Sequence, residues 1–271
     1  KSSKTGKVTV IAHSNGGLLT KALTEKLGSE ASALIDKILF VAVPQAGTPQ
    51  AIGALLHGYV QGLPKDWFSI FLTPSAARTL AANMPSVYNL LPSARYFTQV
   101  DTTVVTFDDS DFLAEFRARY GKTIHDEVQL RNFITDARRL VSVSPDNLQY
   151  PSVGNLGLLA RAETLHTTLD EWVPPQGVSL YEIAGWGEDT LATIAYKEGK
   201  KSHCSNPRDI HTCTDVPTII YYPKEVIEGD GTVLVPSALW TAVSTGVQKY
   251  WVNLEEYGAT NFGTTINRKH A

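Results

Sequence analysis

The sequence is poor in cysteine and methionine and has no long apolar run, and each shortage narrows the possible classes of protein. Two of its 271 residues are Cys, one is Met, and the longest apolar stretch, 38–44, has the length of a strand. A bilayer-spanning helix needs about 20 apolar residues, so no segment is predicted to cross a membrane. Charge of one sign is also lacking, with 24 Lys and Arg against 27 acids. This balance argues against a nucleic-acid partner, which would need a basic face.

The one local basic cluster lies at 197–201, where Glu198 and Gly199 interrupt the lysines. We interpret it as a solvated turn. The apolar share of 43% is typical of a globular protein, and 271 residues allow one large domain or two small ones.

The two cysteines, Cys204 and Cys213, are separated by a turn-rich octet. This spacing predicts a disulfide that closes a short loop and contributes about 2–3 kcal/mol. A disulfide implies an oxidising compartment, so we expect a secreted or extracytoplasmic protein. Two free thiols in a cytosolic protein are the alternative. A zinc site with His203 and His211 is disfavoured, because these residues lack the paired spacing of structural zinc sites.

Residues 7–43 have the pattern of a β-α-β unit. The β-branched run 7–11 is typical of a strand buried on both faces, and 37–43 is a second such strand, ended by Pro44. Between them, apolar residues at helical spacing begin after Gly17 and stop at Gly28. Strand, turn, helix and strand in this order predict a parallel sheet with a crossover helix.

About 130 residues separate Pro44 from the next convincing strand, 178–184. Connections in such folds usually have about 2–6 residues, so we predict an inserted cap over 44–176. Helical patterns within it cover 76–82, 111–120 and 156–172. The aromatic-rich stretch 67–72 is interpreted as cap core, with contact to lipid or an acyl chain as the alternative.

The remaining strands complete the predicted fold. After 178–184 we expect a two-stranded excursion, 191–196 with 218–222, and then a last strand, 247–254. The predicted class is α/β, a mostly parallel sheet with helices on both faces. Residues 1–43 and 177–271 form its core and 44–176 its cap.

Ser14 lies where a strand should turn sharply into a helix. Ala12 and Gly16, two residues before and after it, are small enough to let such a turn close in a strained conformation. The helix N-terminus would direct backbone N–H groups at a developing oxyanion, that of Asn15 first. We interpret this turn as a nucleophile elbow. The alternatives are a phosphate-binding turn and a helix that Ser14 merely caps.

A serine nucleophile needs a base and an acid that orients the base. In folds with such an elbow the chain order is serine, acid, histidine. Of seven histidines only His270 follows the final predicted strand, and it is our candidate base. Asp230, between two glycines in the connection before that strand, is the candidate acid, and Asp189 is its competitor. His13 is interpreted as a neighbour of the elbow, and the three histidines of the predicted cap (His57, His125 and His166) as surface or core residues.

Three segments resemble the lecithin:cholesterol acyltransferase-like branch of the α/β-hydrolases. They are Ala-His-Ser-Asn-Gly-Gly-Leu-Leu at 12–19, Val-Pro-Gln-Ala-Gly-Thr-Pro at 43–49, and Gly-Asp-Gly-Thr-Val at 229–233. The stretch from Arg78 to Pro92 is similar to a cap segment of the same family. The resemblance covers most of the chain, from about Lys7 to His270. One departure is Ala12, where many members have Gly.

The resemblance implies a lipase, phospholipase or acyltransferase that acts on ester-linked acyl groups. It implies Ser14 as nucleophile, Asp230 as acid and His270 as base, with no metal or organic cofactor. The expected partner is a lipid or small ester, with transient contact of the cap with a lipid surface. A non-catalytic binding domain and a peptidase on the same fold are the alternatives. The family's sheet also has strands before the elbow, and only 1–6 precede it here, so we expect the 271 residues to be part of a longer protein.

Overall fold

The structure is a computed structural model. It describes residues 3–59, 73–138, 147–205, 211, 213–242, 246–256, 260–261 and 264–265.

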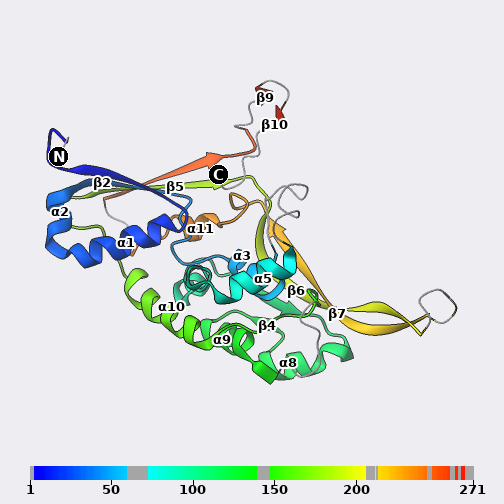
Figure 1. Cartoon of the computed structure of the whole chain (residues 1–271). Coiled ribbons are helices and arrows are strands. Elements are labelled where there is room, and N and C mark those ends of the chain that lie inside the picture. Colours follow the sequence, from blue (N-terminus) through cyan, green and yellow to red (C-terminus); the bar gives the residue numbers. More distant parts are fainter. Residues whose placement is uncertain are drawn as a thin grey trace.

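Four parallel strands form the sheet that carries Ser14 (Figure 1). Their order in space is β1, β2, β5 and β8, and each neighbouring pair is parallel. The bounds are Val8–His13 for β1, Ile35–Val41 for β2, Ser179–Trp186 for β5 and Val247–Asn253 for β8. The predicted α/β class is confirmed. Because all four strands run the same way, the segments that follow them leave the sheet at one edge.

The connection from β1 to β2 is the predicted crossover helix. Helix α1 (Gly16–Leu27) ends at Gly28, which has a φ of +54°. A left-handed residue at this position is easiest for glycine. The short helices η1 (Gly28–Glu30) and α2 (Ala31–Leu34) then lead into β2.

The chain between β2 and β5 is mostly helical, as predicted. Several of these helices begin with a side-chain cap, where Thr48, Thr73, Asp126 and Asn155 accept a hydrogen bond from a backbone N–H of the first turn. The helical segments are α3 (Pro49–His57), α5 (Pro74–Asn83), α6 (Pro85–Asn89), α7 (Ala94–Gln99), η2 (Asp111–Leu113), α8 (Ala114–Tyr120), α9 (Glu127–Thr135) and α10 (Leu156–Leu169). The stretch 67–72 lies outside the described residues.

A second sheet stands beside these helices, with strands in the order β4, β3, β6 and β7. Its strands are β3 (Val105–Phe107), β4 (Thr123–Ile124), β6 (Thr190–Cys204) and β7 (Cys213–Val226). β3 pairs with β6 in parallel, and β6 pairs with β7 antiparallel. The predicted two-stranded excursion is therefore confirmed, and it joins strands from the segment before residue 176. Three short elements complete the chain, namely α11 (Val235–Ala238), β9 (Thr260–Asn261) and β10 (Thr264–Thr265).

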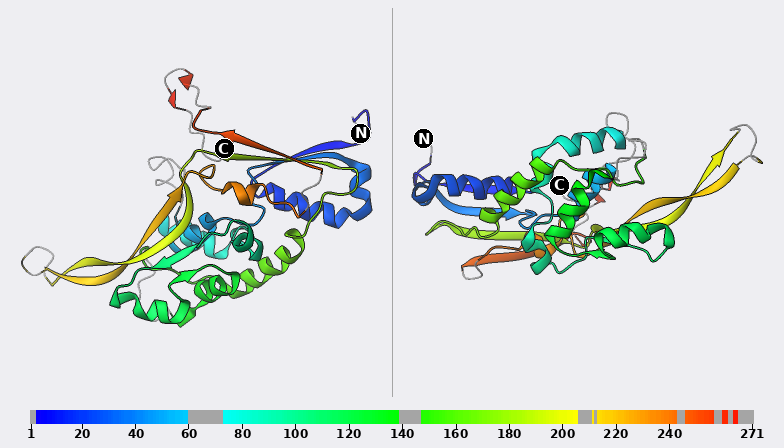
Figure 2. Two further views of the ribbon diagram at one scale, coloured as in Figure 1. Left: turned by 180° about the vertical axis from the view of Figure 1, so that it is seen from behind. Right: turned by 90° about the horizontal axis from the view of Figure 1, so that it is seen from below.

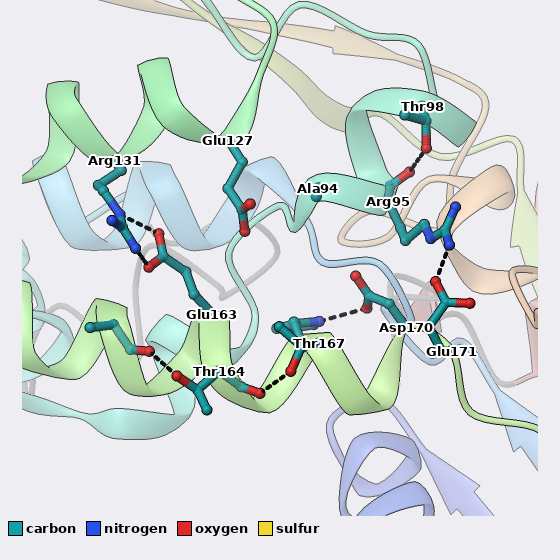
Figure 3. A pocket seen from close by; sticks show the side chains of 12 residues that line it. Ala94, Arg95, Thr98, Glu127, Arg131, Glu163, Thr164, Thr167, Asp170 and Glu171 are labelled. Atoms are coloured by element: carbon teal, nitrogen blue, oxygen red, sulfur yellow. Dashed lines mark hydrogen bonds and ion pairs between the residues drawn. The ribbon is translucent and has the colours of Figure 1, made fainter.

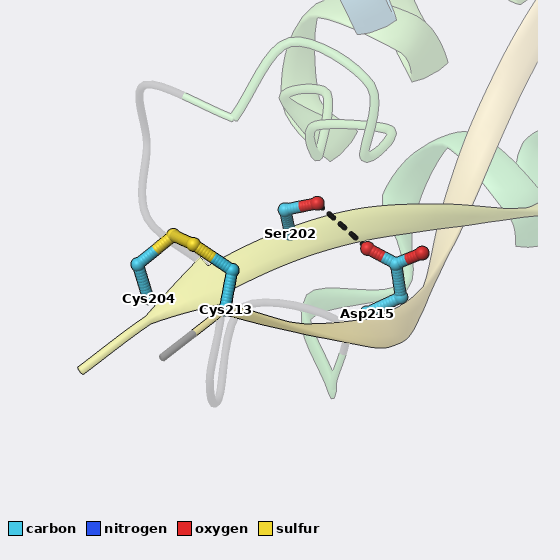
Figure 4. The surroundings of a disulfide bond; sticks show 4 residues. All are labelled: Ser202, Cys204, Cys213 and Asp215. Carbon is cyan, nitrogen blue, oxygen red and sulfur yellow. Dashed lines mark hydrogen bonds between the residues drawn. A yellow bond between two sulfur atoms is a disulfide. The ribbon is translucent and has the colours of Figure 1, made fainter. Parts of the chain in front are cut away.

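β6 and β7 continue past the helices as a two-stranded arm that points away from the rest of the molecule (Figure 2). The predicted disulfide between Cys204 and Cys213 joins the two strands at the outer end (Figure 4). The two cysteines are therefore neither free thiols nor zinc ligands in this structure.

Each sheet has its own apolar core. Under the first sheet, Phe40 of β2 packs 5.7 Å from Trp172, among buried residues that include Ala12 and Leu180. A larger cluster fills the space between the helices and the second sheet, and at its centre the Phe107 ring stacks 5.3 Å from Tyr196. Among the described residues, no helix is long and apolar enough to cross a membrane.

Two expectations about single segments are wrong. The segment 197–201 is mostly exposed, as expected, but it is part of β6, paired with residues 216–220 of β7, and not a turn. The first strand is not buried on both faces, since Ile11 is 70% exposed. β1 is at the edge of the described sheet, and helices α1 and α11 lie on the same side of this sheet (Figure 1).

Candidate active site

Ser14 lies between the last residue of β1 and the first residue of α1, in a left-handed backbone conformation. Its φ is +53°, a value that costs a non-glycine residue about 1–2 kcal/mol. The Ser14 N–H donates a hydrogen bond to the Val41 carbonyl at 3.0 Å, and the Ser14 carbonyl accepts one from the Gly17 N–H at 3.0 Å. These bonds tie the strained residue to β2 and to α1. The structure thus has the sharp strand-to-helix turn that the sequence predicts.

Small residues around Ser14 let the turn close. A Cβ atom added to Gly16 would lie 4.0 Å from the Ala12 Cβ, so these two residues face each other across the turn. A Cβ atom added to Gly17 would lie 2.8 Å from the Val43 Cβ and closer still to its methyl groups. Gly17 is therefore required by the approach of α1 to the segment after β2, and Gly16 is the less crowded of the pair.

Asn15 is the N-cap residue of α1, with a φ of −55°. Its carbonyl accepts a hydrogen bond from the Leu19 N–H at 3.2 Å. Its own N–H precedes the first turn, where no carbonyl lies one turn back along the helix to accept it. α1 has 12 residues, and its positive dipole end is at this turn. An anion beside Ser14 would therefore meet N–H donors and a favourable field.

Asp230 is buried, with 3% of its surface exposed, whereas its competitor Asp189 is exposed. Its Oδ1 accepts hydrogen bonds from the N–H groups of Thr232 at 3.0 Å and Val233 at 2.8 Å. A Cβ atom added to Gly185 would lie 3.0 Å from the Asp230 Cβ. The carboxylate is thus held against the carboxyl end of β5 in a fixed orientation.

The loop after β2 supports the loop that carries Asp230. The Thr48 hydroxyl donates a hydrogen bond to the Thr232 carbonyl at 2.5 Å, and the Ser237 hydroxyl donates one to the Gly47 carbonyl at 2.7 Å. In the sequence, the segment 43–49 is notable only for its resemblance to the family. In the structure it anchors the candidate acid.

Ser14 and Asp230 lie at the same edge of the first sheet, on the two sides of β2. Neighbouring strands are about 4.8 Å apart, so β1 and β5 are separated by roughly 10 Å, a gap that an imidazole between serine and carboxylate can span. The chain after β8 leaves the sheet at this edge as well. His270, the predicted base, lies outside the described residues.

Of the three histidines of the predicted cap, two are buried and hydrogen-bonded and one is exposed. His57 is buried, and its ring nitrogens lie 2.7 Å from the Leu148 carbonyl and the Tyr196 hydroxyl. His166 is buried beside Asp170, with 2.8 Å between Nδ1 and Oδ1. Burial opposes charge on the His166 ring, but the hydrogen bond and charge of Asp170 outweigh it and raise its pKa. His125 is exposed.

A buried polar network below the site was missed by the sequence reasoning. Glu182 of β5 is fully buried and accepts a hydrogen bond from the Gln45 side chain at 2.6 Å, and the Lys249 ammonium lies 3.6 Å from its other oxygen. The Thr241 hydroxyl also donates to Glu182. One signal was visible in the sequence, because a single acid interrupts the apolar strand 178–184.

Lys21 of α1 is also buried, with its ammonium 3.3 Å from the Leu169 carbonyl and over the Trp172 ring. Burial lowers the pKa of Lys21 to about 8, although the charges of Asp170 and Glu182 partly offset this effect. Nothing in the sequence distinguishes this lysine from an exposed one.

A cavity of about 570 Å³ lies between α7, α9 and α10, away from Ser14 and Asp230 (Figure 3). Its charged side chains are paired across it, Arg95 with Glu171 and Arg131 with Glu163. Burial is the main cause that raises the pKa of Glu127 at its wall. The cavity holds neither the serine nor the acid of the candidate site.

Comparison with known proteins identifies the family of the chain. The profile of the lecithin:cholesterol acyltransferase family matches residues 1–263. The chain belongs to the lecithin:cholesterol acyltransferase family. It is 25% identical over 245 residues to phospholipase A(1) LCAT3 of Arabidopsis thaliana, an alignment that covers 86% of this chain and 50% of that protein.

The fold is also found in a solved structure. A chain in the crystal structure of the Tle4–Tli4 complex superposes with a TM-score of 0.55 and 17% identity, covering 98% of this chain and 56% of that one. This member of the lecithin:cholesterol acyltransferase family therefore spans about half the length of the relatives that it matches.

Proposed function

We propose that this chain carries the catalytic serine, acid and base of a hydrolase that acts on the acyl esters of lipids. The observation that carries the proposal is the left-handed Ser14 between the end of the edge strand β1 and the N-terminus of α1. Membership of the lecithin:cholesterol acyltransferase family and likeness to a phospholipase A(1) support lipid esters as the substrate class. Because the chain spans half of that relative, the proposal concerns the activity of the protein that contains these residues.

The proposed reaction has two steps. His270, oriented by Asp230, takes the Ser14 hydroxyl proton while Oγ attacks the ester carbonyl, and the Asn15 N–H donates to the oxyanion. The tetrahedral intermediate collapses, the ester C–O bond breaks, and His270 gives its proton to the departing alcohol. Water, deprotonated by His270, then attacks the acyl-enzyme and releases the carboxylic acid and Ser14.

The alternative acceptor is an alcohol instead of water, which makes the protein an acyltransferase. The family is named after an acyltransferase, which supports this second function as the alternative. Both share the acyl-enzyme, so product analysis by mass spectrometry after reaction of a phospholipid in the presence of a sterol or alcohol distinguishes them. A non-catalytic binding domain is the third reading, and it predicts no ester turnover.

We also propose how the chain divides into core and cap and in which compartment the protein is found. Residues 44–176 form a cap on a core made of 1–43 and 177–271, with β6 of the core paired to β3 of the cap. The Cys204–Cys213 disulfide supports an oxidising compartment, secreted or extracytoplasmic.

The test compares two acids that the sequence left as competitors. Hydrolysis of a p-nitrophenyl ester is measured for Ser14→Ala, Asp230→Asn and Asp189→Asn. We expect Asp230→Asn to lose about 10⁴-fold in kcat, the loss typical of an amide at the acid of a triad. Ser14→Ala should lose at least as much, because it removes the nucleophile. Asp189→Asn is the matched control and should stay within about twofold, since its side chain is exposed, whereas that of Asp230 is buried at the carboxyl end of β5. Equal losses at both acids, or full turnover by Asp230→Asn, would contradict the assignment.

A further inference from the structure

The two strands of the arm sort their charges between two faces. In an antiparallel pair, residues opposite each other in the register share a face. Lys201 lies opposite Val216, and Lys200 lies opposite Pro217. One face of β6 and β7, which we call the outer face, therefore carries Lys197, Gly199, Lys201 and His203 of β6, which lie opposite Ile220, Thr218, Val216 and Thr214 of β7. Tyr222 and Lys224 of β7 belong to the same face.

The outer face is basic and lacks carboxylates. It has three lysines, all exposed, and no Asp or Glu among the residues named above. The acids of the same stretch, Glu198 and Asp215, belong to the opposite face. There the Asp215 carboxylate accepts a hydrogen bond from the Ser202 hydroxyl at 2.6 Å (Figure 4). The interruption by Glu198 in the sequence is thus no interruption in space.

Apolar side chains lie beside the lysines on the outer face. Val216 is 42% exposed and Tyr222 is 46% exposed. Lys197 extends over the Tyr222 ring, with its ammonium 5.0 Å from the ring centre. β6 thus supplies most of the cations and β7 the apolar groups, a combination that suits the boundary between charged headgroups and acyl chains.

The packing of the fold does not account for this sorting. Ile194, Tyr196 and Ile219 of the opposite face contact the core, and Ala195 of the outer face is buried too. From Lys197 to the end of β6, the residues on both faces are exposed or half-buried. Lysines that only prevented edge pairing would serve on either face. The ribbon beyond the core extends over eight residues of β6, 197–204, about 26 Å at 3.3 Å per residue. Tyr222 and Lys224 continue the outer face at the base of this ribbon.

We propose that the outer face of the arm docks on an anionic phospholipid surface. The lysines contact the headgroup phosphates, and Val216 and Tyr222 enter the interface. The choice of a lipid surface over another polyanion rests on the proposed function, since a hydrolase of lipid esters must reach its substrate in an aggregate. The basic, acid-free face is independent of that function.

The test measures co-flotation of the Ser14→Ala protein, which avoids lipid turnover, with two kinds of vesicle. One is phosphatidylcholine alone and the other contains phosphatidylglycerol as well. We expect binding to the anionic vesicles only, weakened by salt, because the Debye length falls from about 10 Å at 0.1 M to about 3 Å at 1 M. Equal binding to both vesicles, or none to either, would overturn the proposal.

Neighbouring lysines provide a matched control. Lys201→Gln on the outer face should weaken binding about fivefold, and Lys201→Gln with Lys224→Gln roughly 20- to 30-fold, the effect of about one and two lysines near an anionic surface. Lys200→Gln removes the same charge from the opposite face and should stay within about twofold, because its side chain points away from the lipid. Equal effects of Lys200→Gln and Lys201→Gln would refute docking by the outer face.

A second readout separates this inference from the proposed function. In the protein with Ser14 intact, Lys201→Gln should hydrolyse a soluble p-nitrophenyl ester at the wild-type rate. Vesicle binding without any ester turnover would overturn the proposed function and leave the docking face intact. Turnover with no preference for anionic vesicles would do the opposite.

Discussion

The strain at Ser14 makes a prediction that separates the elbow from an ordinary helix cap. Replacing Ser14 by glycine or by alanine removes the same hydroxyl, so both variants should be inactive. They differ in backbone, since Ser14 has a φ of +53°. Alanine retains the strain and glycine relieves it.

The expected difference follows from two opposing costs. Glycine occupies the left-handed region without the strain of about 1–2 kcal/mol that alanine has there. Against this, glycine loses about 0.5–1 kcal/mol more conformational entropy on folding than alanine. The Ser14→Gly protein should therefore have a free energy of unfolding up to about 1.5 kcal/mol above that of Ser14→Ala. In a chain of this size that corresponds to at most about 6 °C in Tm.

Urea unfolding of the two proteins measures the difference, provided that both have the same m-value. Ser32 in α2 is the control, because its backbone is helical. There the Ser32→Gly protein should be less stable than Ser32→Ala by about 1 kcal/mol. If glycine is the less stable substitution at both positions, Ser14 is not strained and the elbow interpretation fails.

Two further predictions concern the packing around α1. Gly17→Ala should lower the free energy of unfolding by about 1–3 kcal/mol, since the added Cβ would overlap the buried Val43. Gly16→Ala, the control, should be neutral or stabilising by up to about 1 kcal/mol. Equal losses of the two variants in urea unfolding would show that the contact with Val43 is absent. Burial lowers the pKa of Lys21 to about 8 in the folded protein, whereas the pKa of an unfolded lysine is about 10.5. Between these two pH values the unfolded chain binds a proton that the folded chain does not. The free energy of unfolding should therefore fall by about 3 kcal/mol as the pH is lowered from about 10.5 to 8. Lys21→Met should remove this dependence and raise stability below pH 8; an unchanged slope between pH 8 and 10 in denaturant titrations would contradict it.

Local patterns predicted the part of the fold around Ser14. The β-branched runs, the helical spacing and the stop at Gly28 define a β-α-β unit, and small residues at 12 and 16 define the turn between its first two elements. Each of these signals acts over a few residues, so the sequence contains it without reference to the rest of the chain. The same holds for Asp230, whose burial follows from a tight loop between two glycines.

Long-range packing was not predictable in this way. Whether Ile11 is covered depends on what lies beside β1, and the sequence of the strand does not contain that information. The burial of Lys21 depends on Trp172 and Leu169, about 150 residues away. At 197–201 a composition of lysine, glutamate and glycine resembled a turn, because pairing with β7 and the sorting of charges between faces appear only in the register of the two strands.

Covalent labelling of Ser14 tests the central claim most directly. A fluorophosphonate phosphonylates a serine hydroxyl only where a base activates it and donors stabilise the resulting oxyanion. Peptide mass spectrometry after labelling should find the adduct on Ser14, absent from Ser14→Ala and much slower to form in Asp230→Asn. An adduct that forms elsewhere and persists in Ser14→Ala, or a folded protein that forms none, would contradict the account.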